Sequence, residues 1–218
     1  MSFVFPPPSQ PAVDVVGRVE RFPVHRIYCV GRNYAAHARE MGKDPEREPP
    51  FFFTKPADAI VPSGTSIPFP SRTADLHHEI ELVVALGQGN SVFGYAVGLD
   101  LTRRDLQAEA KNNGRPWDTA KGFDRSAPIT AITPASQVQL DGGKIWLDVN
   151  GVQRQRGALA DMIWSVPEII AALATLFELA PGDLIYTGTP AGVAALSPGD
   201  RLEGGVDGLQ TLRLEIGR

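Results

Sequence analysis

Glycine and proline recur along the whole of this sequence, and they limit the kind of fold that it can adopt. The chain has 22 glycines and 19 prolines among its 218 residues. Glycine favours turns, while proline ends helices and interrupts the hydrogen-bond ladders of sheets. The sequence therefore predicts many turns and short elements, and it argues against a helix bundle. With 43% hydrophobic residues, the chain is long enough to form one sizeable core.

A β-hairpin in the second half of the chain is the clearest local signal. Apolar and polar residues alternate over residues 145–149, Asn150-Gly151 is typical of a type I′ turn, and residues 152–156 return. Helices are predicted at 31–42, 102–111 and 169–179, the last two behind capping boxes that begin at Thr102 and Ser165. Other strands are predicted at residues 27–30, 51–56, 82–86, 94–101, 184–186, 202–203 and 211–216.

Two carboxylates stand at the start of an apolar run in the first half of the chain. Glu79 and Glu81 precede residues 82–86, which have the composition of a buried strand. Alternate side chains of a strand point to the same face, so the two carboxylates would project together. Carboxylates this close repel each other unless a cation lies between them. The residues alone leave two interpretations open: a metal-binding pair, or a solvent-facing row of glutamates on an edge strand.

Charge and cysteine content exclude several classes of function. The chain has 21 basic and 25 acidic residues, a net charge of −4, and no basic cluster, so we expect no nucleic-acid partner. No run approaches 18 apolar residues, so we expect no membrane partner. The single cysteine, Cys29, rules out an internal disulfide framework and is expected to be a buried small hydrophobe. Without a signal-peptide pattern, the chain is predicted to be cytoplasmic.

The N-terminal composition suggests how the chain is divided. Prolines 6–8 and Pro11 favour an extended arm over packed structure. We therefore expect residues 1–22 to be a proline-rich N-terminal extension and residues 23–218 to form a single domain. Within the domain, the phenylalanines of residues 51–53 are expected in the core, whereas the Lys55 cation could meet an anionic ligand.

Several short motifs follow one another in a particular order from Ile27 onward. They are Cys29–Tyr34 with His37 and Glu40, His78–Leu82, Asp100 with Arg104–Gln107, Lys121–Asp124, Val149–Gly151, Pro181–Asp183 and Thr187–Pro190. In order and spacing the set resembles the fumarylacetoacetate hydrolase family, and within it the branch of acylpyruvases and fumarylpyruvate hydrolases. The chain departs from the commonest family pattern at His77-His78, where an Asp-Tyr pair is usual, at Arg103 and at Ala194.

The resemblance implies a fold and a metal. The fold would be α+β and β-rich, a mixed β-roll or flattened β-sandwich of the family's C-terminal-domain type with a few short helices, usually in a homodimer. Residues 23–218 would be the catalytic domain. The metal would be Mg²⁺ or Mn²⁺, held by Glu79, Glu81 and Asp100. An all-oxygen ligand set suits these hard cations.

The resemblance also implies an activity, namely metal-dependent hydrolysis of a carbon–carbon bond in a 2,4-diketo acid (an acylpyruvate). The most specific expectation is cleavage of fumarylpyruvate to fumarate and pyruvate in gentisate-type degradation of aromatic rings. His37 would be the general base, oriented by Glu40, and Lys121 would add positive charge near the metal-bound oxygens. The residues implied in substrate binding are Arg32, Arg104, Gln107 and Thr189, with Arg32 at the distal carboxylate of a fumaryl group. Whether Arg103 or Arg104 faces the substrate is open.

Other functions remain compatible with these residues. An oxaloacetate decarboxylase on the same scaffold would form the same enolate, and a general acylpyruvase would accept other acyl groups. A non-catalytic, β-rich binding module is a more distant alternative.

Overall fold

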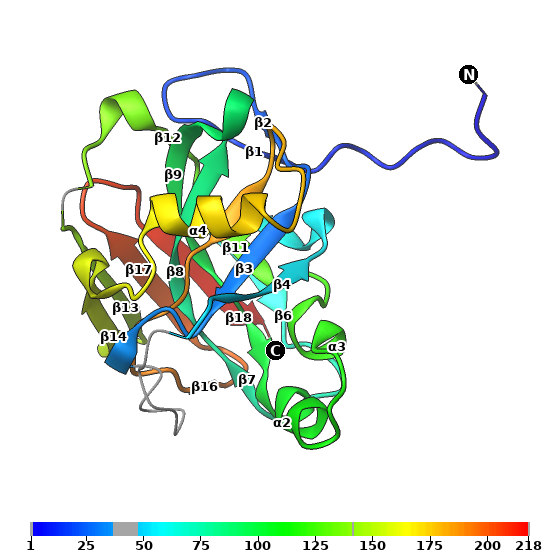
Figure 1. Cartoon of the computed structure of the whole chain (residues 1–218). Coiled ribbons are helices and arrows are strands. Elements are labelled where there is room, and N and C mark those ends of the chain that lie inside the picture. Colours follow the sequence, from blue (N-terminus) through cyan, green and yellow to red (C-terminus); the bar gives the residue numbers. More distant parts are fainter. Residues whose placement is uncertain (1, 37–47, 141, 218) are drawn as a thin grey trace.

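The structure is a computed structural model that describes residues 2–36, 48–140 and 142–217 (Figure 1). Within these residues, the larger sheet contains eight strands. Their order is β4 (Phe51–Lys55), β3 (Ile27–Gly31), β15 (Leu184–Tyr186), β8 (Ile80–Leu86), β9 (Val92–Leu99), β11 (Ala127–Ile129) and β5 (Ile60–Pro62), with β12 (Thr133–Pro134) beside β9. The β3–β15 and β11–β5 pairs are parallel and the remaining pairs are antiparallel, so the sheet is mixed.

The second sheet has five strands in the described part of the chain. Their order is β14 (Val152–Ala158), β13 (Lys144–Val149), β17 (Arg201–Val206), β18 (Leu212–Gly217) and β6 (Thr65–Pro68). Strands β13 and β14 confirm the predicted hairpin. Asn150 and Gly151 both have positive φ, 54° and 75°, as a type I′ turn requires.

Smaller elements complete the fold. Two short sheets pair β1 (Ala12–Val13) with β2 (Phe22–Pro23), and β7 (Leu76–His77) with β10 (Thr102–Arg103) and β16 (Ala195–Leu196). The α-helices in the described residues are α2 (Arg104–Asn112), α3 (Asp118–Lys121) and α4 (Val166–Ala174). Single 3₁₀ turns occur at η1 (Ala57–Ala59), η2 (Gln88–Asn90), η3 (Ala135–Gln137) and η4 (Leu159–Asp161).

The two larger sheets pack face to face. Ile80 and Leu82 of β8 share one buried cluster with Leu147 of β13 and Leu214 of β18. Ile169 and Leu173 of α4 join a second cluster with Val84 and Leu86 of β8 and with residues of β3 and β15, and Figure 1 shows α4 lying across these strands. Mixed sheets with a few short helices confirm the predicted α+β, β-rich fold class.

The N-terminal segment contains both packed and exposed residues. Val13 and Val15 are buried in a cluster that includes Ile27 and Ile132. Residues 2–9 form an arm that extends away from the domain, with exposed side chains at positions 3–5 (Figure 1). The boundary between residues 1–22 and 23–218 stays a prediction.

Two helix predictions need correction. Helix α4 begins with the predicted capping box, in which Ser165 N donates to Glu168 Oε2 at 2.9 Å, but it ends at Ala174 instead of residue 179. Thr102 caps nothing, because it lies on β10 and its hydroxyl oxygen accepts from Lys121. Helix α2 follows from N-cap Arg103, without a side-chain cap. Of the helix predicted at residues 31–42, residues 37–42 lie outside the described residues, and its predicted first residue, Gly31, belongs to strand β3 instead.

None of the helices in the described ranges has the length and apolar content needed to span a bilayer.

Candidate metal centre and active site

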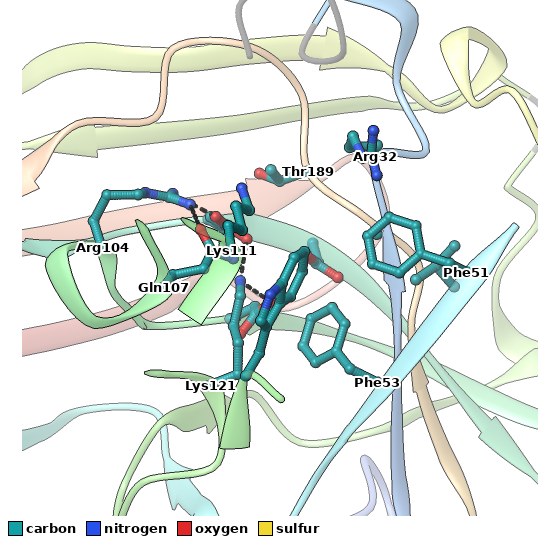
Figure 2. A pocket seen from close by; sticks show the side chains of 14 residues that line it. Arg32, Phe51, Phe53, Arg104, Gln107, Lys111, Lys121 and Thr189 are labelled. Atoms are coloured by element: carbon teal, nitrogen blue, oxygen red, sulfur yellow. Dashed lines mark hydrogen bonds and ion pairs between the residues drawn. The ribbon is translucent and has the colours of Figure 1, made fainter. Parts of the chain in front are cut away.

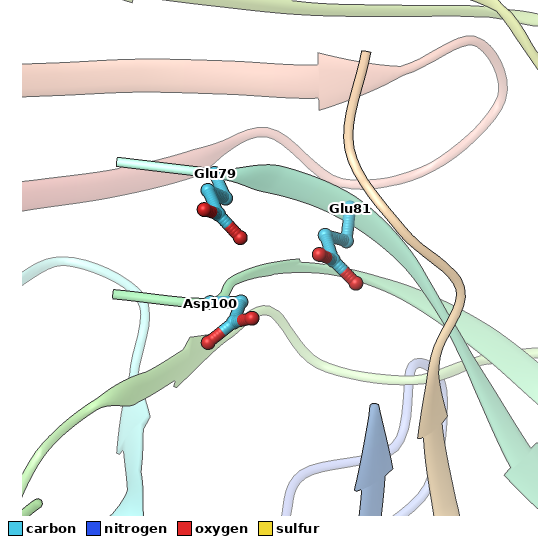
Figure 3. Close-up of side chains that lie close together, drawn as sticks. All are labelled: Glu79, Glu81 and Asp100. Carbon is cyan, nitrogen blue, oxygen red and sulfur yellow. The ribbon is translucent and has the colours of Figure 1, made fainter. Parts of the chain in front are cut away.

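Strand pairing brings together the three carboxylates expected to hold a metal. Glu79 directly precedes β8, Glu81 lies in it, and Asp100 directly follows β9. The two strands are antiparallel, and the Asp100 amide donates to the Glu79 carbonyl at 2.9 Å. Each of the three side chains offers an oxygen within 4.8 Å of the others (Figure 3). We call Glu79, Glu81 and Asp100 the acidic triad.

The acidic triad is buried. Glu79 is 6% exposed, and Glu81 and Asp100 are each 1% exposed. The interpretation as a solvent-facing row of glutamates is therefore wrong. Burial, together with the charges of Asp100 and Glu79, raises the pKa of Glu81 well above its ordinary value. Three carboxylate oxygens this close fit a hard divalent cation such as Mg²⁺ or Mn²⁺. A cation bound between them would offset both their mutual repulsion and the loss of hydration on burial.

Lys121 lies against the acidic triad, at the C-terminal end of α3. Its Nζ donates to Glu79 Oε2 at 2.8 Å, to Asp100 Oδ2 at 2.6 Å and to Thr102 Oγ1 at 2.7 Å, which uses all three ammonium hydrogens. Burial lowers the pKa of Lys121, but the charges of Asp100 and Glu79 outweigh this effect and raise the pKa above its ordinary value. Lys121 is therefore charged at neutral pH.

Lys55 differs from its expected role. Its side chain is fully buried, and its Nζ lies 2.8 Å from Asp100 Oδ1. The same nitrogen donates to the carbonyl oxygens of Leu101, at 3.2 Å, and Lys121. Lys55 thus neutralises Asp100 of the acidic triad, and it is not among the residues that line the pocket.

Helix α2 places the substrate-binding candidates Arg104 and Gln107 beside the acidic triad. Arg104 Nη2 donates to Glu79 Oε1 at 2.6 Å, and its Nη1 donates to Gln107 Oε1 at 2.7 Å. This contact shows the shared helix face that their spacing predicts. Arg103 turns away: its guanidinium lies 4.4 Å from the centre of the Phe123 ring and donates to the Thr119 carbonyl. Arg104, not Arg103, lines the pocket.

The segment after β15 supplies the remaining polar contacts. The Gly188 amide donates to Glu81 Oε2 at 2.8 Å. Gly188 has φ of 99°, and a Cβ there would lie 2.7 Å from that of Asn33, so a glycine is required. Thr189 Oγ1 accepts from Gln155 Nε2 at 2.8 Å, which leaves the Thr189 hydroxyl hydrogen available to a ligand.

Gln155 connects Thr189 to the start of β8, beside Glu79 and Glu81. Its Oε1 accepts from the Ile80 amide at 3.1 Å and lies 2.8 Å from His78 Nδ1. Sequence reasoning missed this residue. It occupies a strand with mostly exposed neighbours, and nothing in the local pattern distinguishes it from a surface glutamine.

These residues surround a pocket of about 350 Å³, within the range of small-molecule sites. Phe51, Phe53 and Trp117 form an aromatic wall of the pocket. Figure 2 shows Phe51 and Phe53 on one side of the pocket and Arg104, Gln107 and Lys121 on the other. Phe51 and Trp117 meet edge to face, with ring centroids 5.4 Å apart. The expectation that Phe51 and Phe53 serve only core packing was incomplete, and the parts played by Trp117 and Lys111 were missed. The full lining is Val30, Gly31, Arg32, Phe51, Phe53, Glu79, Glu81, Asp100, Arg104, Gln107, Lys111, Trp117, Lys121 and Thr189.

The structure thus brings together Arg32, Arg104, Gln107, Lys121, Thr189 and the acidic triad. His37 and Glu40, the expected general base and its orienting carboxylate, lie outside the described residues.

Known proteins share this fold and much of this sequence. The crystal structure of fumarylpyruvate hydrolase from Pseudomonas aeruginosa, in complex with Mn²⁺ and pyruvate, is 51% identical, covers 99% of each chain and has a TM-score of 0.96. A fumarylpyruvate hydrolase from a Ralstonia species is 43% identical over 189 residues, 81% of this chain and 98% of the relative. The mitochondrial oxaloacetate tautomerase of Homo sapiens is 41% identical over 201 residues, 87% of this chain and 90% of the relative.

The family model for the fumarylacetoacetate (FAA) hydrolase C-terminal region matches residues 26–216. The match covers the strands and helices that build the pocket, from β3 to β18. The chain therefore belongs to the fumarylacetoacetate hydrolase family.

Proposed function

We propose that this chain is a divalent-metal-dependent hydrolase of 2,4-diketo acids, and that it cleaves fumarylpyruvate to fumarate and pyruvate. The observation that carries the proposal is the buried acidic triad at the base of a small pocket, with Lys121 in direct contact with it. The similarity to a fumarylpyruvate hydrolase described with Mn²⁺ and pyruvate supports both the metal and the 2-oxo acid.

The charges around the triad favour an anionic substrate. Among the described residues, the three carboxylates are matched in number by three cations, Lys55, Lys121 and Arg104, which form ion pairs with Glu79 and Asp100. A divalent cation held by the triad would leave two positive charges in excess. A substrate with two carboxylates would neutralise that excess, whereas a neutral substrate would leave buried charge uncompensated.

Each pocket residue has a part in the proposed reaction. Glu79, Glu81 and Asp100 would hold the metal, which supplies positive charge that polarises the oxygens of the 2-oxo acid. The Lys121 ammonium adds a fixed positive charge beside the same oxygens. The Thr189 hydroxyl has a free hydrogen to donate to a substrate oxygen. Arg104 fixes the side chain of Gln107, whose amide group is then aimed at the substrate.

Water must also be activated for hydrolysis. We assign this step to His37, which would take the proton from water, with Glu40 fixing the tautomer of the imidazole. The assignment rests on the family resemblance of the segment from Cys29 to Glu40. Arg32, at the other end of the pocket, would contact the distal carboxylate of the fumaryl group.

A second candidate is tautomerisation of oxaloacetate, which the similarity to oxaloacetate tautomerases favours. Oxaloacetate is also a dicarboxylic 2-oxo acid, so the pocket charges suit both compounds. Decarboxylation of oxaloacetate, the alternative expected from shared enolate chemistry, is tested in the same experiment.

The experiment compares three reactions of one preparation. Protein stripped with chelator and reloaded with Mn²⁺ or Mg²⁺ is given fumarylpyruvate or oxaloacetate, and fumarate, pyruvate, CO₂ and enol content are measured. We expect metal-dependent release of equal amounts of fumarate and pyruvate. Turnover of oxaloacetate alone would refute the hydrolase assignment, and no metal-dependent turnover of either compound would favour a binding module.

We also propose that the chain acts as a homodimer in the degradation of aromatic rings. Light scattering of the purified protein tests the dimer. Growth on gentisate after deletion of the gene tests the metabolic role, and undiminished growth would contradict it.

A further inference from the structure

Helix α2 presents a third polar residue to the pocket, in addition to Arg104 and Gln107. Lys111 lies four residues beyond Gln107, so these residues share one face of the helix. Its side chain lines the pocket, and Lys111 is exposed whereas the acidic triad is buried. Lys111 differs in this from Lys121, whose three donors are all used on Glu79, Asp100 and Thr102.

Lys111 and Arg32, two cations of the pocket, rest on aromatic rings. The Lys111 ammonium lies 5.0 Å from the centre of the Trp117 ring, and the Arg32 guanidinium lies 4.8 Å from the centre of the Phe51 ring. Phe51 and Trp117 contact each other, so both cations rest on the same aromatic wall. We call Arg32 and Lys111 the distal cation pair.

The distal cation pair has charge to offer a ligand. In the part of the chain that the structure describes, neither Arg32 nor Lys111 forms an ion pair with a carboxylate. Partial burial, followed by the positive charges of Arg104 and Arg32, lowers the pKa of Lys111. Like charges repel, so an anion placed between them is stabilised by both. Ring contacts leave the nitrogen hydrogens free to donate to such an anion.

The backbone at Arg32 supports a functional role. Arg32 has φ of 57°, in the left-handed region that residues other than glycine seldom adopt. It directly follows β3, and this conformation turns the chain at the pocket. Such strain persists where the surrounding structure holds a side chain in place for function.

We propose that Arg32 and Lys111 together form a site for the second carboxylate of a dicarboxylic 2,4-diketo acid, with Lys111 as a residue that determines acyl-group specificity. This inference rests on the proposed function and deepens it. The diketo end of the substrate would lie over the acidic triad, and the flat, apolar double bond of a fumaryl group would lie along the aromatic wall. The distal carboxylate would then reach the distal cation pair.

The test compares two substrates that differ at the distal end. Fumarylpyruvate carries the second carboxylate, whereas acetylpyruvate is a 2,4-diketo acid with a neutral methyl group there. kcat and KM are measured on Mn²⁺-loaded wild type, Lys111→Met, Lys111→Arg and the control Lys144→Met. Lys144 is exposed at the start of β13 in the other sheet.

We expect Lys111→Met to lower kcat/KM for fumarylpyruvate by about 10- to 100-fold, mainly through KM, because one charge-assisted hydrogen bond is lost. Acetylpyruvate has no distal carboxylate for Lys111 to bind. The kcat/KM of Lys111→Met for acetylpyruvate is therefore expected to stay within about threefold of wild type, a difference of well under 1.4 kcal/mol. Lys111→Arg should restore most of the loss, and Lys144→Met should behave as wild type.

Other outcomes would overturn the inference. An equal loss on both substrates would mean that Lys111 supports the fold or the triad, and no loss on either would remove it from the site. A wild type that hydrolyses acetylpyruvate but shows no preference for fumarylpyruvate would refute the distal site and leave the diketo acid hydrolase intact. A wild type that hydrolyses neither would refute the proposed function and the distal site with it.

Discussion

Replacing Glu81 by Gln should stabilise the metal-free protein while removing its response to metal. Glu81 is 1% exposed, and its pKa is raised by burial and by the charges of Asp100 and Glu79. Gln has nearly the same shape, carries no charge and can still accept the hydrogen bond from the Gly188 amide. The change therefore removes an electrostatic cost without removing the contact.

The linkage between pKa and stability gives the direction of the effect: ionising a carboxyl whose pKa is raised by folding destabilises the folded protein. The magnitude follows from substitutions of buried charged groups by neutral groups of similar volume, which stabilise proteins by about 1–4 kcal/mol, so we expect a gain of about 2 kcal/mol for Glu81→Gln above neutral pH. For a domain of this size, that gain corresponds to roughly 4–8 °C in Tm.

The sign of the pH dependence is also determined. A carboxyl with a raised folded-state pKa binds its proton more tightly in the folded protein. Its stabilising effect is present below the ordinary value of 4.5 and is lost as pH rises through the folded-state pKa. In excess chelator, the difference in Tm between Glu81→Gln and wild type should therefore widen as pH rises from about 5 towards 9.

Differential scanning calorimetry measures these changes, with Glu215→Gln as a matched control at an exposed, weakly paired glutamate. Mn²⁺ at about 100 times its Kd should stabilise the wild type by about 2.7 kcal/mol and the Glu81→Gln variant much less. A Glu81→Gln variant that is less stable than wild type in chelator, yet gains as much from Mn²⁺, would refute the reasoning about the acidic triad.

Three further substitutions probe the other parts of the site. His37→Ala should leave Mn²⁺ affinity unchanged and lower kcat on fumarylpyruvate by about 10²- to 10⁴-fold, the range for a general base; unchanged kcat would exclude His37 from that role. Lys55→Met should lower the free energy of unfolding by about 3 kcal/mol in chelator, because Asp100 loses the buried ammonium group 2.8 Å from its Oδ1. Urea titration measures the change, and an unfolding midpoint that did not fall would contradict the prediction. Gln155→Leu should lower the free energy of unfolding by about 1–3 kcal/mol, because the buried Ile80 amide loses its acceptor. It should also raise KM for fumarylpyruvate, because Thr189 loses the donor that orients its hydroxyl. A loss of stability with KM unchanged would show that Thr189 does not bind the substrate.

Local sequence patterns were sufficient for some elements of the fold. The hairpin of β13 and β14 follows from alternation around Asn150-Gly151, where both residues need positive φ. Strand β8 follows from its apolar run, and the two-residue period of strands puts Glu79 and Glu81 on the same side. Helix α2 was predicted nearly to its last residue, although its expected cap was wrong.

The remainder of the site depends on contacts between segments that are far apart in the sequence. Asp100 joins the acidic triad only because β9 pairs with β8 in one register, and no local period encodes that register. It entered the prediction through family resemblance. Lys55 was expected to face a ligand, but its direction depends on Asp100, which lies on a different strand.

The aromatic wall shows the same limitation. Large apolar residues usually fill cores, and Phe51 and Phe53 differ from core phenylalanines only through the empty space in front of them. Lys111 and Trp117 belong to a helix and a loop whose relative position is a tertiary property. Their pairing through a ring contact could not be inferred from spacing in the chain.

Titration of Mn²⁺ into chelator-stripped protein, with bound metal and fumarylpyruvate hydrolysis followed in the same sample, tests the role of the acidic triad most directly. We predict that activity rises in proportion to bound Mn²⁺, that both saturate at one ion per chain, and that Asp100→Asn abolishes both. Two results would contradict a metal-dependent hydrolase built on Glu79, Glu81 and Asp100. One is full hydrolytic activity before any metal binds, and the other is an Asp100→Asn variant that binds Mn²⁺ and turns over fumarylpyruvate as the wild type does.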